Sequence, residues 1–242
     1  MLGIIGGSGF ENFEGFETVE RLNAATPFGE ISSGFRKVRI GGRDALFVSR
    51  HGQHHELTPS EVNYRANIYA LQKLGASAAF ATYASGAITN YKPADLVLLE
   101  DFLGFNTPIT FFDDFSAGLK HFDFTEPFDK DLQNAVLEIA NSLRIKIKKG
   151  GVVATTTGPR FETKAEIKAL KKLGANLVNM TSAYEITLFH EMEIPFAAIA
   201  VTTNYACGIS KKRLSTEEVM EQMNNAKPKI NLIINGLVDY VR

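Results

Sequence analysis

The sequence has little of three things: cysteine, net charge and long hydrophobic runs. Cys207 is the only cysteine, so no intrachain disulfide can form, which is typical of a reducing compartment. The 26 basic and 27 acidic residues give a formal net charge of −1, so we expect binding to neither nucleic acid nor an anionic membrane. No apolar run has the length of a membrane span, and no signal-peptide pattern opens the chain. We therefore expect a cytoplasmic protein.

The remaining composition is that of an ordinary globular protein. Hydrophobic residues make up 45% of the 242 positions, which suffices for a full core. Strand-like and helix-like stretches alternate without a repeat or a flexible linker, and this order predicts one α/β domain over residues 1–242, with a central mixed β-sheet flanked by helices. Gly41-Gly42 predicts a hairpin turn, and Pro228 predicts an interruption in a last helix over residues 216–241.

Five predicted strands end in small or polar residues. Because ligands bind at the carboxyl ends of strands in α/β sheets, we expect these ends to meet at one small-molecule site. The residues concerned are Ser8, Arg50-His51, Tyr83-Ala84, Met180-Thr181 and Asn204.

The first of these ends is glycine-rich. In Gly6-Gly7-Ser8-Gly9, free backbone N–H groups and the Ser8 hydroxyl suit a phosphate, although a simple tight turn would need the same glycines. The dinucleotide fingerprint G-x-G-x-x-G requires glycine at position 12, where Asn12 stands. A nicotinamide cofactor is therefore not favoured.

The second end carries an arginine and three histidines, Arg50, His51, His54 and His55. Metal binding is one interpretation, but Glu56 is the only carboxylate nearby and no second ligand cluster exists, so we expect no metal. The fork of an arginine matches phosphate oxygens, which favours an oxyanion site. A solvated polar loop remains the alternative.

The stretch from Thr157 to Thr163, TGPRFET, joins a predicted strand to a predicted helix. Glu162 beside Phe161 suits recognition of a planar, hydrogen-bonding ligand. The same position suits a helix start, where an acid complements the helix dipole. Both interpretations stay open at this point.

Residues 101–128 form the least regular segment of the chain. Long loops of this kind are usually functional or buried by a partner. The segment contains His121 and the phenylalanines 102, 105, 111, 112, 115, 122, 124 and 128.

Jointly, these motifs resemble the trimeric purine nucleoside phosphorylase and methylthioadenosine phosphorylase family, most closely the methylthioadenosine branch. The resemblance implies phosphorolysis of a purine nucleoside to free base and ribose 1-phosphate in purine salvage. Inorganic phosphate would be a co-substrate, no cofactor would be needed, and the protein would be a homotrimer or a dimer of trimers. The motifs that carry it are IIGGSG from Ile4, SRHG from Ser49, VNYRAN from Val62, TGPRFET from Thr157 and NMT from Asn179.

The resemblance also implies roles for individual residues. Phosphate would be held by Ser8, Arg50, His51, Ala84 and Thr181, and by Tyr83, although this branch usually has threonine there. Met180 would lie against the ribose, and His121 would complete the sugar site of a neighbouring subunit. The base would contact Phe161, Glu162, Asn204, Tyr205 and Ala206, with Asn204, His51 and Glu162 as the catalytic residues. Leu214 and Thr216 would contact the 5′ group.

The pair Glu162 and Asn204 predicts which purine is accepted. An ionised Glu162 accepts a hydrogen bond from N1–H of a 6-oxopurine, and the Asn204 amide serves O6 and N7. Adenine would instead turn a bare N1 lone pair toward Glu162, and a buried unmade hydrogen bond costs about 1–3 kcal/mol. In the family an acid in place of Asn204 accompanies 6-aminopurines. We therefore predict cleavage of inosine and guanosine.

Other activities remain open from the sequence. Leu214 would favour a 5′-methylthio group and Thr216 a 5′-hydroxyl, so a methylthioadenosine or methylthioinosine phosphorylase is the main alternative. A hydrolytic nucleosidase would release the base without phosphate, which the pair Arg50 and His51 argues against. A purine-binding protein would not turn over at all.

Overall fold

The strand-forming stretches build one mixed sheet. The structure, a computed structural model, describes residues 1–11, 13–114, 118–211 and 213–241, so Asn12 and Phe115 of the sequence analysis lie outside it. Within these ranges nine strands are hydrogen-bonded. They are β1 (Leu2–Gly6), β2 (Glu17–Arg21), β3 (Arg36–Ile40), β4 (Arg43–Ser49), β5 (Ala78–Ala87), β6 (Leu96–Leu103), β7 (Ile147–Thr155), β8 (Leu177–Asn179) and β9 (Phe196–Tyr205).

The order of the strands closes part of the sheet on itself. The sequence of neighbours is β2-β3-β4-β1-β5-β8-β7-β6-β9, and β9 also pairs with β5. The strands β5, β8, β7, β6 and β9 therefore form a ring, from which β1, β4, β3 and β2 extend. In the parallel register of β5 and β9, Gly86 lies opposite Asn204. The predicted mixed sheet is confirmed, whereas its closure has no signature in the sequence because pairing between distant strands leaves no local pattern.

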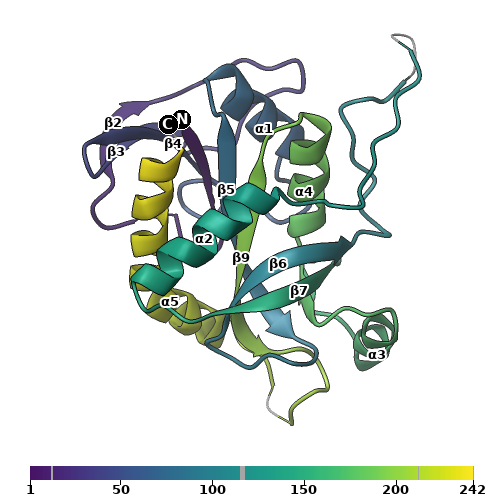
Figure 1. The fold of residues 1–242 in the computed structure, drawn as a ribbon. Coiled ribbons are helices and arrows are strands. Elements are labelled where there is room, and N and C mark those ends of the chain that lie inside the picture. The colour runs from purple at the N-terminus through teal and green to yellow at the C-terminus, as the bar shows by residue number, and fades with distance from the viewer. Residues whose placement is uncertain (12, 115–117, 212, 242) are drawn as a thin grey trace.

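Helices cover both faces of the sheet (Figure 1). Neighbouring residues of β1 enter different apolar layers, since side chains alternate along a strand. Ile4 packs in the layer of α2 and α5, and Ile5 packs in the layer of α1 and α4. The helices are α1 (Tyr64–Lys73), α2 (Lys130–Ser142), α3 (Lys164–Lys172), α4 (Ser182–Glu191) and α5 (Thr216–Tyr240).

Two local predictions have different outcomes. The hairpin at Gly41-Gly42 is confirmed, and both glycines have the positive φ angles, 56° and 84°, that such a turn requires. The interruption at Pro228 is wrong, because α5 runs without a break through this residue. Buried residues on both sides of it, among them Met223 and Ile230, pack in the same apolar layer. This packing outweighs the backbone hydrogen bond that proline removes.

The segment after β6 is irregular, as predicted. No helix or strand lies between residues 104 and 129 in the described part of this segment. Glu191 of α4 anchors it by accepting hydrogen bonds from Thr110 Oγ1 and the Phe111 N–H, both at 2.7 Å. Further along, Phe105 and Leu119 are each 71% exposed, so this chain does not cover the whole segment.

Among the described residues no helix combines the length and the apolar character that a membrane crossing requires.

Candidate functional site

A cavity of about 340 Å³ lies where β1, β4, β5, β8 and β9 end. This volume is in the range of small-ligand pockets. The strand ends therefore meet at one cavity, as predicted. The role of each side chain stays a prediction. The predicted site residues that line the cavity are Ser8, Arg50, His51, Ala84, Phe161, Glu162, Met180, Thr181, Asn204 and Thr216.

The glycine-rich turn brings the chain close to Arg50. The Phe10 N–H donates to the Gly7 carbonyl at 2.8 Å, which closes the turn around Ser8. A Cβ on Gly7 would lie 2.8 Å from the Thr82 carbonyl oxygen and would clash with the guanidinium of Arg50. Glycine is thus required here by space, and the turn and the arginine form one packed unit.

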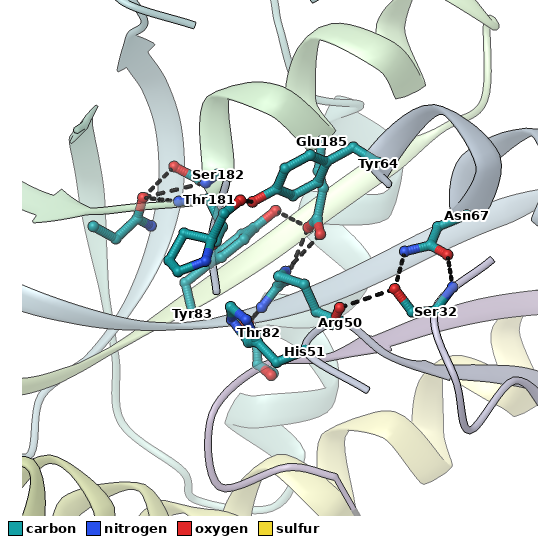
Figure 2. A network of polar contacts seen from close by, with 12 residues as sticks. Ser32, Arg50, His51, Tyr64, Asn67, Thr82, Tyr83, Thr181, Ser182 and Glu185 are labelled. Atoms are coloured by element: carbon teal, nitrogen blue, oxygen red, sulfur yellow. Dashed lines mark hydrogen bonds and ion pairs between the residues drawn. The ribbon is translucent and has the colours of Figure 1, made fainter. Parts of the chain in front are cut away.

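The side chain of Arg50 is buried, with 1% of its surface exposed, and Figure 2 shows it between Glu185 and the Thr82 carbonyl. Its Nε and Nη2 donate to Glu185 Oε1 and Oε2 at 2.5 and 2.8 Å, and its Nη1 donates to Thr82 O at 3.1 Å. Burial acts to lower the pKa of Arg50, but the charge of Glu185 outweighs it and the pKa is raised. Arg50 therefore stays charged inside the protein.

His51 has its two ring nitrogens in different roles. Nδ1 lies 2.9 Å from the carbonyl oxygen of Leu57, which can only accept, so Nδ1 carries the proton in the neutral ring. Burial, followed by the charge of Arg50, lowers the pKa of His51 to about 4. At neutral pH the ring is therefore uncharged, and Nε2 has a lone pair.

Thr181 is the N-cap residue of α4, yet its hydroxyl makes no capping hydrogen bond. The Asn179 side chain takes that role, since its Oδ1 accepts from the Thr181 and Ser182 N–H groups at 3.3 and 3.2 Å. The Thr181 hydroxyl therefore remains available to a molecule in the cavity.

Tyr83 departs from the prediction. It is buried and does not line the cavity; its hydroxyl donates to Glu185 Oε2 at 2.6 Å, and its ring lies 4.5 Å from Arg50 Cζ. A phosphate contact through this side chain is therefore not supported. Sequence reasoning also missed Glu185, because it is 135 positions away from Arg50 along the chain and no local pattern signals their pairing.

Glu162 lies in the cavity and is not the N-cap of the helix that follows it. The N-cap of α3 is Thr163, and Glu166 completes a capping box with it. Glu162 precedes the cap and lines the cavity, with 6% of its surface exposed. Its Oε1 accepts from Thr156 Oγ1 at 2.8 Å. Burial raises the pKa of this carboxyl.

Asn204 lies at the end of β9 with its amide held by neighbours. Its Oδ1 accepts from Thr203 Oγ1 at 2.7 Å, and its Nδ2 donates to the Tyr205 carbonyl at 3.0 Å. An amide NH₂ has two donor hydrogens, so one N–H remains for a ligand. The lining of the cavity thus includes the Glu162 carboxylate and the oriented Asn204 amide, the two groups predicted to bind the base.

Several predicted residues lie outside this cavity. Tyr205 is 38% exposed, Ala206 packs in a small apolar cluster with Ile88, and Leu214 is half-buried away from the lining. His121 lines a separate hollow near His190. Conversely, Leu57, Pro59 and Val219 line the cavity although they were not predicted.

Where the chain is described, its histidine, cysteine and acidic side chains form no group of three or more that could hold a metal ion.

Comparison with known proteins gives a consistent set of relatives. The sequence model of the Phosphorylase superfamily matches residues 1–239. A probable S-methyl-5′-thioinosine phosphorylase of Methanopyrus kandleri is 38% identical, over 99% of this chain and 92% of the relative. The 6-oxopurine nucleoside phosphorylase of Pyrococcus furiosus is 37% identical with the same coverage. An S-methyl-5′-thioadenosine phosphorylase of Ciona intestinalis is 37% identical, over 92% of this chain and 82% of the relative.

The fold is shared with solved structures. The methylthioadenosine phosphorylase of Schistosoma mansoni, in a complex with adenine, superimposes with a TM-score of 0.91 at 30% sequence identity. The match covers 99% of this chain and 91% of that structure. The relatives thus include proteins named for 6-oxopurines and proteins named for adenine-containing nucleosides.

Proposed function

Because the chain belongs to the Phosphorylase superfamily, we propose that it cleaves purine nucleosides by phosphorolysis and prefers 6-oxopurine bases. One observation carries this proposal. A single cavity is lined both by phosphate-binding group types, in Arg50, Ser8 and Thr181, and by the buried pair Glu162 and Asn204. The first set suits a phosphate, and the second suits the edge of a purine.

In the proposed reaction, a phosphate oxygen forms a bond to C1′ of the ribose while the bond from C1′ to the purine nitrogen breaks. The electron pair of that bond moves onto the purine, and the ribose passes through an oxocarbenium-like state. Phosphate held by Arg50, Ser8 and Thr181 stabilises the positive charge on the sugar. The free N–H of Asn204 donates to N7 or O6 as negative charge arrives there. Contacts that strengthen in this way lower the barrier.

The preference for 6-oxopurines follows from the two buried side chains. Glu162 Oε1 is already engaged by Thr156, and Oε2 is left to accept N1–H of hypoxanthine or guanine. The free N–H of Asn204 has an acceptor in O6. An adenine would leave both groups mismatched, and two unmade contacts of about 1–3 kcal/mol each correspond to discrimination on the order of 10³-fold.

A second candidate is a 5′-methylthioinosine phosphorylase, which uses the same base contacts. Leu57, Pro59 and Val219 give the cavity an apolar side that suits a methylthio group. Thr216, one turn before Val219 on α5, offers a hydroxyl for a 5′-hydroxyl group. Relatives with names of both kinds are found at similar identity.

We further propose that the enzyme works in the cytoplasm as a homotrimer or a dimer of trimers, without a cofactor. The exposure of Phe105 and Leu119 supports a partner surface on the described residues 104–114 and 118–129. In such an oligomer His121 of this segment would approach the sugar site of a neighbouring subunit. Sedimentation of the purified protein tests this, since a monomer at working concentration contradicts it.

Initial rates with a panel of nucleosides test the proposed function. Inosine, guanosine, adenosine, methylthioinosine and methylthioadenosine are each incubated with and without phosphate. We expect base release only with phosphate, and faster release from inosine than from adenosine by on the order of 10³-fold. Faster cleavage of the adenine nucleosides contradicts the base preference, and equal rates without phosphate indicate a hydrolase. The ratio of methylthioinosine to inosine decides between the two candidates.

A further inference from the structure

A buried carboxylate lies behind the arginine of the proposed phosphate site. Glu185 belongs to the first turns of α4 and is 2% exposed. It does not line the cavity; both of its oxygens instead accept hydrogen bonds from Arg50, at 2.5 and 2.8 Å. The carboxylate is therefore next to the site without access to a bound molecule.

Tyr83, on β5, also contacts Glu185. Its hydroxyl, on β5, donates to Glu185 Oε2 at 2.6 Å, and its ring lies along the guanidinium, 4.5 Å from Arg50 Cζ (Figure 2). Burial and then the charge of Glu185 raise the pKa of Tyr83 well above its ordinary value. The hydroxyl therefore stays protonated and acts as a donor.

These contacts use some of the N–H groups of Arg50 and leave the others available to a ligand. A guanidinium has five N–H groups, and three are used: Nε–H and one Nη2–H by Glu185, and one Nη1–H by Thr82 O. One N–H remains on each terminal nitrogen. Arg50 lines the cavity, so two N–H groups from adjacent nitrogens are available to the oxygens of one phosphate, the geometry that arginine favours.

The charges point to orientation as the role of Glu185. The positive charge of Arg50 is balanced by Glu185, and the neutral His51 adds none, so this group of three carries no net charge. Binding of a phosphate anion beside this group therefore depends more on the orientation of the N–H donors than on excess positive charge. Resting on the function proposed above, we infer that Glu185 and Tyr83 are positioning residues, which hold the Arg50 guanidinium in the orientation that binds phosphate.

Binding of inorganic phosphate to the free enzyme, measured by calorimetry, tests this inference. Glu185→Gln replaces one acceptor oxygen by an NH₂ that faces Nε or Nη2 of Arg50, so one of the two hydrogen bonds that orient the guanidinium is lost. We expect the Kd for phosphate to rise at least about tenfold, as for the loss of a hydrogen bond to a charged group. If Glu185 merely neutralised Arg50, its removal would free a positive charge and phosphate would bind more tightly.

Tyr83→Phe is the milder variant, since it keeps the ring beside Arg50 and removes only the hydroxyl. We expect a rise of a few-fold, about three to ten, in the Kd for phosphate, and the same rise in the KM for phosphate with an unchanged KM for the nucleoside. Glu191→Gln is the matched control: Glu191 is a buried glutamate of the same helix that bonds Thr110 and Phe111 instead. It should leave the Kd unchanged.

Tighter phosphate binding by Glu185→Gln, or a Kd within twofold of the wild type in both test variants, overturns the inference. An equal rise in Glu191→Gln also overturns it, because the effect would then reflect any buried charge on α4. Wild-type enzyme that binds phosphate but cleaves no nucleoside contradicts the proposed function alone. Wild-type enzyme that does not bind phosphate contradicts both.

Discussion

Replacing Asn204 by aspartate changes the hydrogen-bonding character of the base pocket with almost no change of shape. Asn204 is 5% exposed, and one N–H of its Nδ2 is bound to the Tyr205 carbonyl at 3.0 Å. The other N–H is the donor that we assign to O6 or N7 of a 6-oxopurine. An ionised aspartate has only acceptors, so this donor disappears and an acceptor for a 6-amino group takes its place.

The size of the effect follows from this exchange. A 6-oxopurine loses one buried hydrogen bond, about 1–3 kcal/mol, which corresponds to a kcat/KM lower by about 5- to 150-fold for inosine. Adenosine gains an acceptor for its amino group, a net contribution of about 0.5–1.5 kcal/mol. The ratio of kcat/KM for inosine to that for adenosine should therefore fall by about 10- to 10³-fold.

The assay measures kcat/KM for both nucleosides at saturating phosphate. Asn176→Asp is the matched control, because Asn176 is also buried and bonds the backbone of Gly150 and Val152 away from the cavity. It should leave the ratio unchanged. A ratio that stays at the wild-type value in Asn204→Asp, or that falls equally in the control, refutes the assignment of Asn204 to the base.

Four further predictions concern His51, Glu162 and Gly7. The pKa of His51 is lowered from 6.5 to about 4 in the folded protein. About 3 kcal/mol of the free energy of unfolding is therefore present above pH 6.5 and lost as the pH falls toward 4. In urea unfolding, His51→Gln should lose less stability than the wild type over this pH range, by about this amount, and an equal loss in both proteins contradicts the prediction. The folded-state pKa of Glu162 is raised above 4.5, so the stability from its neutral carboxyl is present below that pH and lost as the pH rises through the folded pKa; Glu162→Gln should therefore gain stability over the wild type with rising pH. A protonated Glu162 can also donate to N1 of adenine, so the ratio of kcat/KM for inosine to that for adenosine should fall as the pH is lowered through the raised pKa of Glu162. A ratio that stays constant as the pH is lowered speaks against this contact. Gly7→Ala should weaken phosphate binding by at least about tenfold, because its Cβ displaces Arg50. Gly42→Ala is the control for a general loss of stability, because it strains a turn with a φ of 84° that does not line the cavity. Equal Kd values for phosphate in Gly7→Ala and the wild type would show that Arg50 tolerates the shift.

The sequence was sufficient for the parts of the fold and site that have local signatures. The glycine turn at Ser8, the Arg50-His51 pair and the strand ends at Thr181 and Asn204 were predicted to meet, and they line one cavity. The ends at Ser8, Arg50-His51 and Asn204 could be predicted because each is marked by a change from apolar to small or polar residues, and the parallel strands β1, β4, β5 and β9 place such ends at one edge of the sheet. Thr181 reaches the same cavity from β8, which runs antiparallel to β5.

The rest depends on contacts between distant parts of the chain. Pairing of β5 with β9 closes the ring of strands, and Arg50 forms an ion pair with Glu185. Neither contact has a signature in the sequence, because the segments that meet are far apart in the chain. Tyr83 was assigned to phosphate because its position on the strand is right, but its long side chain reaches Glu185 instead. A break in the last helix was predicted at Pro228 because proline disfavours the interior of a helix. The packing of α5 against the sheet overrides that preference.

The central claim is that phosphate, and not water, takes the sugar from the base. Phosphorus NMR of a reaction with inosine and inorganic phosphate tests it most directly, because the signal of each phosphorus species is observed during turnover. We predict that inorganic phosphate is consumed in step with hypoxanthine release and that ribose 1-phosphate appears in equal amount. Hypoxanthine release with an unchanged phosphate signal and free ribose as the product would contradict the account.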